Sequence, residues 1–302
     1  MVSVIVPAYR EEKSIGKALK IIIDQLGELG QDSELILVCP DTQTRDAARR
    51  VVEEKNFQNF VYIKDKPGKY GSGKINALNL AFERAMGDIL VCTDADVVIG
   101  DKAIPVLLKH FSDKKIGGVT GRPVCANDRN NIYGYWGHMF MDAAHRRRME
   151  TLGKGRIFHL SGYLLAMRNL KFQIPTGVLD DVYISYKLAD LGYKLAYEPD
   201  AKVFVRQPGN IKDWLRQKIR SVSGEKDMLE YFENSDECSS RSFSNELKYI
   251  FYPLSYASTL KEFFWGLLQY PVRLYTWVMS WWLTRVRGKK PGEIWKRVDT
   301  TK

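Results

Sequence analysis

Short apolar runs alternate with helix-length amphipathic segments over the first third of the chain. The apolar runs have the length of buried strands: Val2–Val6, Glu34–Cys39, Phe60–Ile63 and Ile89–Thr93. The intervening segments repeat apolar positions at helical spacing: residues 13–28, 43–55 and 74–86. Strands that alternate with helices predict βαβ units and a mostly parallel central sheet covered on both faces. The fold class that we expect is therefore α/β.

The middle of the chain shows a more mixed pattern. Helical spacing covers residues 129–150, Asp180–Leu191 and residues 211–231. Two further apolar runs, Val119–Cys125 and Gly162–Met167, predict strands.

The pattern changes from about Asn245, where aromatic and aliphatic residues dominate. Charged residues and Pro271 interrupt residues 247–284, so the run of about 18 apolar residues that a membrane span needs is not reached. We expect two amphipathic helices, broken near Pro271, that lie in a membrane interface. Helices that only cap the protein core would give a similar pattern. The expected division is an α/β domain over residues 1–243 and a Trp-rich amphipathic region over residues 244–302.

The charge distribution favours a membrane surface over nucleic acid. The net charge is +10, and Trp265–Lys302 holds eight basic residues, two acidic residues and five of the seven tryptophans. Tryptophan beside basic residues is typical of the lipid headgroup zone. No helix combines a dense basic face with interleaved aromatic residues, so we expect no nucleic-acid partner.

Cysteine and histidine spacing gives no sign of disulfides or of a zinc site. The four cysteines lack a paired spacing, which favours free thiols in a reducing compartment. The N-terminus lacks the features of a secretory leader. We expect a peripheral or monotopic protein at the cytoplasmic face of the membrane.

The clearest chemical signal is Asp94–Ala95–Asp96, directly after the strand Ile89–Thr93. Ligands of parallel sheets bind beyond the carboxyl ends of the strands. Two neighbouring carboxylates repel each other unless a cation lies between them. A Mg²⁺ or Mn²⁺ ion that bridges to a diphosphate meets that need.

A glycine-rich run, Pro67–Gly73, precedes this strand by one helix and ends at Lys74. Glycines, free amides and a lysine suit a diphosphate, although the run is not a P-loop and a solvated loop is the alternative. Within the helix, Asn76 and Asn79 are expected to tie it to neighbouring loops.

Two further clusters are ambiguous from the residues alone. Asp180–Asp181 at a helix start fits either a general base for an acceptor hydroxyl or a structural pair of helix N-terminal acids. Gln217 and Arg220 share a helix face and fit either a phosphate or sugar site or an ordinary solvated face.

Together these residues resemble the inverting GT-A glycosyltransferases of family 2, the group of cellulose, hyaluronan and dolichyl-phosphate mannose synthases. The resemblance runs from Val2 to about Gly224 and rests on motifs in order: Val4–Glu12, Val38–Asp41, Gly73–Asn79, Gly87–Asp96, Gly162 with Arg168, Leu179–Asp181 and Gln217–Ser221. It implies a Rossmann-like GT-A domain that carries catalysis. Arg10 stands where asparagine is usual, and Cys39, Pro40 and Ser221 also depart from the family pattern.

The resemblance also implies roles for individual residues. The nucleoside side of the donor site would comprise Pro7, Ala8, Tyr9, Glu11 and Asp41. The diphosphate and sugar side would comprise Lys74, Asp94 and Ala95, with the metal bound by Asp96 and Asp94. Asp181 would be the catalytic base, and Gly162, Asp180, Gln217 and Arg220 would lie on the acceptor or diphosphate side.

The expected reaction is a single in-line displacement that transfers one sugar, with inversion, from a UDP- or GDP-sugar. The expected acceptor is a lipid-linked polyprenyl-phosphate or glycan at the membrane surface. Two alternatives stay open. One is a non-catalytic module that binds nucleotide sugars, and the other is a nucleotidyltransferase.

Overall fold

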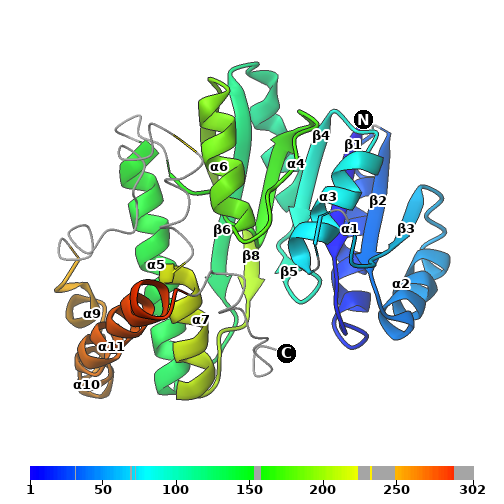
Figure 1. Cartoon of the computed structure of the whole chain (residues 1–302). Coiled ribbons are helices and arrows are strands. Elements are labelled where there is room, and N and C mark those ends of the chain that lie inside the picture. Colours follow the sequence, from blue (N-terminus) through cyan, green and yellow to red (C-terminus); the bar gives the residue numbers. More distant parts are fainter. Residues whose placement is uncertain are drawn as a thin grey trace. The chain divides into compact units, whose positions relative to one another are not determined.

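A mixed eight-stranded sheet with the strand order β3-β2-β1-β4-β7-β6-β8-β5 forms the first part of the fold (Figure 1). Its strands are β1 Val2–Pro7, β2 Ser33–Cys39, β3 Phe60–Lys64, β4 Ile89–Thr93, β5 Val98–Ile99, β6 Ile116–Cys125, β7 Leu164–Arg168 and β8 Lys194–Val205. The computed structural model describes residues 1–30, 32–68, 70–71, 73–152, 158–223, 232 and 249–288.

The half of the sheet that contains β3, β2, β1 and β4 is parallel, as its sequence predicts. Val4 of β1 lies opposite both Leu35 of β2 and Val91 of β4. The other half is antiparallel where β4 pairs with β7, β7 with β6, and β5 with β8. All four strands of the parallel half therefore end at one edge, which carries the residues after Pro7, Cys39, Lys64 and Thr93.

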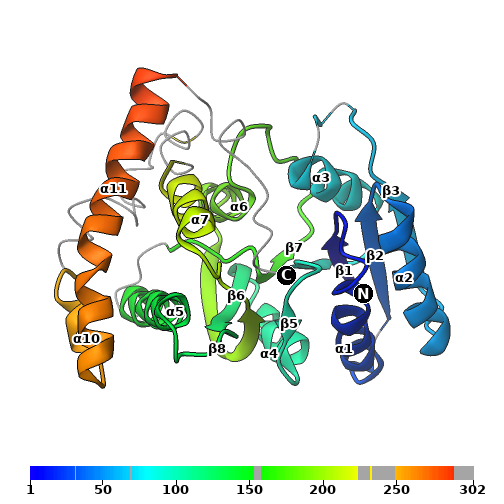
Figure 2. The same cartoon turned by 90° about the horizontal axis from the view of Figure 1, so that it is seen from below.

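Helices on both faces bury the parallel half. They are α1 Ile15–Gly27, α2 Thr42–Glu54 and α3 Lys74–Arg84. The helix α4 Ala103–Lys109, followed by the short 3₁₀ turn η1 His110–Ser112, packs instead against β8 and β7. Figure 2 shows α1 and α3 on opposite faces of β1 and β2. The central residues Val4, Ile5 and Leu37 are completely buried, so the helices shield both faces of these strands.

Three elements of this region were not predicted: the short α4 and β5, and the 12-residue strand β8. The last residues of β8 alternate strictly, with Ala201, Val203 and Val205 buried and Lys202 and Phe204 exposed. This period of two is the signal of a strand with one solvated face, and it could have revealed β8.

The chain forms two compact units. The first contains residues 1–123, 160–176 and 187–205, and the second contains residues 124–159, 177–186 and 206–302. The expected domain boundary at residue 243 lies outside the described residues and stays a prediction.

The second unit is helical. Its helices are α5 Ile132–Leu152, the start of α6 Asp180–Asp190, α7 Ile211–Ser223, α9 Tyr252–Ser255, α10 Leu260–Leu267 and α11 Gln269–Trp281, with the π-helical turn η4 Trp282–Val286. The helix expected over 211–231 is described as far as Ser223. The expected break near Pro271 falls at Leu268, and Pro271 lies in the first turn of α11, where its missing N–H costs no helical hydrogen bond.

An aromatic cluster joins the C-terminal helices to α5 and α7. Tyr135, Trp136 and Trp214 are at most 2% exposed and pack against Trp265 and Tyr256. The indole Nε1 of Trp136 donates a hydrogen bond of 2.8 Å to the carbonyl of Trp265. No helix among the described residues has both the length and the apolar content needed to cross a bilayer.

Candidate functional site

The acidic pair follows β4 at the carboxyl edge of the parallel strands. Ala95 is 3% exposed, while Asp94 and Asp96 on either side of it are half-buried. Thr93 Oγ1 donates a hydrogen bond of 2.8 Å to the carbonyl of Tyr163. That contact places the loop around Gly162, just before β7, beside the end of β4.

Lys74 meets Asp94 directly. Its Nζ lies 2.8 Å from Asp94 Oδ1, and the two side chains are 35% and 24% exposed. Lys74 is the first residue of α3, and the preceding Gly73 has a φ of +77°, a left-handed conformation that glycine adopts without strain. The start of α3 therefore brings a cation to the acidic pair.

Asparagine side chains anchor α3, as the sequence indicated. Asn76 Nδ2 donates to Asp65 Oδ1 at 2.5 Å and to the carbonyl of Lys66 at 3.0 Å. Asn79 exchanges two hydrogen bonds of 2.8 Å with the backbone of Ile174. Burial raises the pKa of Asp65, and the hydrogen bond from Asn76 opposes that rise. Lys69 and Ser72 of the glycine-rich run lie outside the described residues.

The turn after β1 presents the residues expected around a nucleoside. Pro7 ends the strand, and Ala8 N–H donates to the carbonyl of Val38 at 2.9 Å. Tyr9 is 46% exposed, and the guanidinium of Arg10 lies 5.2 Å from the centroid of its ring. The ring and the cation together offer a surface on which a planar base can stack.

Two side chains that the sequence analysis did not single out, Thr44 and Ser14, hold Glu11. Glu11 is 8% exposed, and its backbone N–H donates to Thr44 Oγ1 at 2.8 Å. Its carboxylate accepts a hydrogen bond of 2.7 Å from Ser14 Oγ. Glu11 therefore helps to fix the turn between β1 and α1.

Asp41 links two of the turns at this edge. Its Oδ1 accepts the N–H of Thr44 at 2.8 Å and so caps α2, and its Oδ2 accepts the N–H of Arg10 at 2.9 Å. Burial acts to raise the pKa of Asp41, but these hydrogen bonds outweigh it and leave the pKa below its usual range. The carboxylate is consequently ionised at neutral pH.

Tyr62 is a further candidate that the sequence analysis missed. Its hydroxyl donates to the carbonyl of Cys39 at 3.2 Å, and Arg45 and Arg49 lie 5.9 and 5.8 Å from its ring centroid. The arginines are four residues apart on α2, a spacing that puts them on one helix face and could have drawn attention to them.

The remaining candidates belong to the second unit. Asp180 and Asp181 are the first two residues of α6, and Asp181 Oδ1 accepts the N–H of Val182 at 2.9 Å. On α7, Gln217 Oε1 is buried without a hydrogen-bond partner among the described residues, and Arg220 lies one turn further on. A buried, unpartnered amide oxygen is costly, which is compatible with a ligand that satisfies it.

A divalent cation fits the acidic pair when a ligand supplies part of its shell. No group of three or more His, Cys, Asp or Glu side chains suited to a metal occurs among the described residues. Asp94 and Asp96 offer hard oxygen ligands, and Mg²⁺ and Mn²⁺ commonly complete such a pair with phosphate oxygens and water. The described cysteines Cys39, Cys92 and Cys125 are buried thiols that form no disulfide, and burial raises the pKa of Cys39 to about 12.

Comparison with known proteins gives consistent matches. The family model described as "Glycosyltransferase like family 2" matches residues 1–224. Poly-beta-1,6-N-acetyl-D-glucosamine synthase of Staphylococcus aureus (strain COL) is 24% identical over 236 residues, which cover 76% of this chain and 55% of the relative. The same-named protein of Staphylococcus epidermidis is 25% identical with the same coverage. The chain thus spans about half the length of the curated relatives it matches.

A solved structure shares the fold. The mannosyltransferase PcManGT from Pyrobaculum calidifontis, in complex with GDP-Man and Mn²⁺, matches with a TM-score of 0.61 and 20% sequence identity. The match covers 96% of this chain and 88% of that chain. The α/β fold class expected from the sequence is thereby confirmed.

Proposed function

Because the chain belongs to glycosyltransferase family 2 and has the GT-A fold, we propose that it transfers a sugar, with inversion, from a UDP- or GDP-sugar to an acceptor hydroxyl or phosphate. The observation that carries this proposal is the Lys74–Asp94 contact of 2.8 Å, directly where β4 ends. It gathers a cation and two carboxylates at the sheet edge where ligands of parallel α/β sheets bind.

The donor is held by residues of the first unit. The nucleoside rests on Pro7, Ala8 and Tyr9, with Glu11 and Asp41 fixing the turns that form this surface. Lys74 at the start of α3 contacts the diphosphate, and the backbone N–H groups of the helix start favour the same anion. Asp94 and the buried Ala95 flank the ribose and sugar.

The acidic pair, Asp94 and Asp96, is the proposed metal site. Asp96, together with Asp94, holds Mg²⁺ or Mn²⁺ through carboxylate oxygens. When bound, the ion supplies positive charge to the departing nucleoside diphosphate. Lys74 contributes a second positive charge to the same leaving group.

Acceptor activation is assigned to the second unit. Asp181 removes the proton of the acceptor as its oxygen attacks the anomeric carbon. Asp180 precedes it at the start of α6, where the helix dipole stabilises both carboxylates. Gln217 and Arg220 of the second unit and Gly162 of the first unit are assigned to the acceptor or diphosphate side. The buried Oε1 of Gln217 has no hydrogen-bond partner within the described part of the chain, and it gains one when a hydroxyl or ammonium donor binds.

A donor panel tests the proposed reaction. UDP-, GDP- and dTDP-sugars are incubated with Mn²⁺ or Mg²⁺, and the released nucleotide is identified. Release of a nucleoside diphosphate that is lost in Asp181→Asn supports the proposal. Pyrophosphate release would indicate a nucleotidyltransferase, and binding without turnover would indicate a nucleotide-sugar sensor.

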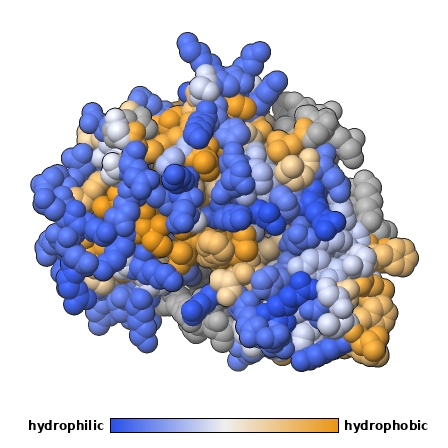
Figure 3. Space-filling model, turned by 180° about the vertical axis from the view of Figure 1, so that it is seen from behind, coloured by the Kyte–Doolittle hydropathy of each residue, from blue (hydrophilic) through white to orange (hydrophobic). Residues whose placement is uncertain are grey.

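The proposal of an acceptor at the membrane is based on the outward face of the C-terminal helices. Large apolar side chains of α10, of α11 and of Leu268 between them are exposed to solvent: Leu260 80%, Phe264 62%, Leu268 50%, Leu274 61%, Val278 53% and Trp281 55%. Figure 3 shows apolar side chains at its lower right edge, where these helices lie in that view. Exposed apolar side chains that gather on one face favour docking to another apolar phase.

The inward side of α11 combines buried polar residues with Val272, which packs against the aromatic cluster. Gln269, Thr276 and Ser280 of α11 are at most 1% exposed, and Ser280 hydrogen-bonds Ser223 of α7 at 2.9 Å. A helix with small and polar residues inward and large apolar residues outward is suited to lipid on its outer side. We assign the outer face to the cytoplasmic surface of a bilayer, with the protein peripheral or monotopic and the acceptor lipid-linked.

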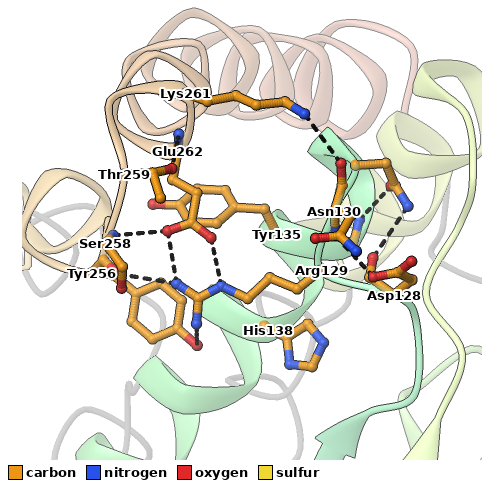
Figure 4. Close-up of polar contacts among 12 residues, drawn as sticks. Asp128, Arg129, Asn130, Tyr135, His138, Tyr256, Ser258, Thr259, Lys261 and Glu262 are labelled. Carbon is orange, nitrogen blue, oxygen red and sulfur yellow. Dashed lines mark hydrogen bonds and ion pairs between the residues drawn. The ribbon is translucent and has the colours of Figure 1, made fainter.

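An ion pair holds this face in place (Figure 4). Arg129 Nε and Nη2 donate to the two carboxylate oxygens of Glu262 at 2.7 and 2.9 Å, and Glu262 also accepts the N–H of Ser258 at 2.7 Å. The guanidinium also lies 4.7 Å from the ring centroid of Tyr256. These contacts fix the start of α10 on the residues before α5, so its apolar side chains stay outward.

A further inference from the structure

The Lys74–Asp94 contact has a consequence for how the metal site fills. The ammonium lies 2.8 Å from Asp94 Oδ1, so it already neutralises one carboxylate of the acidic pair. Both side chains are more than half buried, which weakens solvent screening of their charges. Lys74 therefore does for Asp94 part of what a divalent cation would do.

A cation that approaches the acidic pair meets two obstacles. It competes with Lys74 for Asp94, and like charges repel at this distance. It also finds no third His, Cys, Asp or Glu ligand grouped with the pair among the described residues. Both obstacles disappear when a diphosphate is present, because its oxygens complete the shell and give Lys74 an anion of its own.

We infer that Lys74 couples metal binding to nucleotide binding. With the nucleotide absent, Lys74 lowers the affinity of the acidic pair for a divalent cation. With the nucleotide present, Lys74 turns to the diphosphate and the penalty is removed. The inference rests on the proposed function, because it needs the diphosphate beside Asp94 and Asp96.

This arrangement has a practical benefit for catalysis. By linkage, whatever factor the nucleotide adds to metal affinity, the metal adds to nucleotide affinity. Free protein would hold little metal, and the complete site would form only when donor and metal arrive together. Lys74 is thus a positioning residue for the metal as well as a diphosphate ligand.

The inference is tested on the full chain by measuring the binding of Mn²⁺ alone. Binding is monitored through the loss of the EPR signal of the free ion. The substitution Lys74→Met removes the charge and keeps an unbranched side chain of similar length, and Lys74→Arg keeps the charge. Lys20→Met is the matched control, because Lys20 makes an ion pair of the same 2.8 Å length with Glu54, on α1 and α2. Thermal melts and circular dichroism check that each variant is folded.

Opposite signs are expected for the two ligands. Lys74→Met binds Mn²⁺ alone about 3–10-fold more tightly than the unsubstituted protein, and binds UDP or GDP more weakly. In the unsubstituted protein, the nucleoside diphosphate tightens Mn²⁺ binding by about 10-fold or more at fixed free Mn²⁺, and Lys74→Met loses most of that gain. Lys20→Met behaves as the unsubstituted protein, and Lys74→Arg, which keeps the charge, retains the weak binding of Mn²⁺ alone.

Unchanged or weaker binding of Mn²⁺ alone by Lys74→Met would overturn the inference. Asp96→Ala separates this outcome from failure of the proposed function. If Asp96→Ala abolishes Mn²⁺ binding while Lys74→Met leaves it unchanged, the metal site stands and only the coupling is wrong. If Asp96→Ala binds Mn²⁺ normally, the metal lies elsewhere and the proposed function loses its metal site.

Discussion

Two helices of equal length, α1 and α11, differ in which side chains they bury and which they expose. Each has 13 residues. In α1, apolar residues such as Leu19 and Ile22 are at most 1% exposed, and Lys17 faces solvent. In α11 the order is inverted: Thr276 and Ser280 are buried, and Leu274 is 61% exposed.

The buried glutamines of the two helices make the same contrast. In α1, Gln25 donates to the carbonyl of Gly100 and accepts the N–H of Ile104, both at 2.9 Å. In α11, Gln269 is 1% exposed, and neither amide atom has a hydrogen-bond partner among the described residues. The packing of α1 is thus complete within the protein. The apolar face of α11 needs a second apolar phase, so the region of α1 should govern chemistry and the region of α11 should govern docking.

The largest effect should follow from Asp96→Ala in the first region. Loss of a metal ligand removes charge stabilisation from the leaving group, so release of nucleoside diphosphate should fall by at least about 10³-fold. Binding to anionic lipid vesicles, measured by co-sedimentation, should not change. Reduced vesicle binding together with full turnover would reverse the division of roles.

Paired leucine truncations compare the two helices directly. Leu19→Ala should cost about 2–5 kcal/mol of unfolding free energy, because the Leu19 side chain is completely buried and its truncation leaves a cavity. Leu274→Ala should change the unfolding free energy by less than about 0.5 kcal/mol, since most of its side chain is exposed. Chemical denaturation measures both, and equal costs would mean that Leu274 packs within the protein.

Charged substitutions on the outer face of α11 test the membrane surface. Leu274→Glu combined with Val278→Glu should weaken binding to anionic vesicles by about 10–100-fold, because both side chains lose apolar contact with lipid. Turnover with a soluble acceptor should persist. Lys17→Glu on α1 is the matched control, since it changes the net charge by the same amount and should have a much smaller effect on vesicle binding. Deleting residues after 245 is a poorer test, because it would also uncover Trp136 and Trp214.

The last prediction concerns how the stability contributed by the Arg129–Glu262 ion pair depends on pH. Hydrogen bonds from the Arg129 guanidinium hold the pKa of Glu262 below its ordinary value of 4.5. A lowered folded-state pKa means that the pair stabilises the fold above about pH 4.5, and that this contribution is lost as the pH falls through the folded value. Glu262→Gln should cost about 1–3 kcal/mol at neutral pH, with the partial exposure of Arg129 favouring the lower end. The cost should vanish in thermal melts at strongly acidic pH, and a constant cost would contradict the assignment.

The parallel half of the sheet was predictable because its signals are local. The strand Ile89–Thr93 was predicted with the bounds that the structure has, and the bounds of β1 and β2 differ by one residue. Continuous apolar runs between helical spacings suffice for such elements. The individual candidates Lys74, Asp94 and Asp96 followed from their places after glycines or at a strand end.

Contacts between distant residues could not be predicted in the same way. Arg129 and Glu262 are 133 residues apart, and Ser223 and Ser280 are 57 apart. The amphipathic pattern of α11 shows that it has two faces, but not which face meets the protein. That choice depends on the aromatic cluster of α5 and α7, which exists only once the helices have packed. Likewise, the ion pair of Lys74 with Asp94 depends on the start of α3 meeting the end of β4.

The most direct test of the central claim is a crystal structure with Mn²⁺ and a nucleoside diphosphate. We predict the ion on the carboxylates of Asp96 and Asp94, and phosphate oxygens within hydrogen-bonding distance of Lys74 Nζ. An ion and a diphosphate bound away from residues 94–96, with Lys74 still paired to Asp94, would contradict the account.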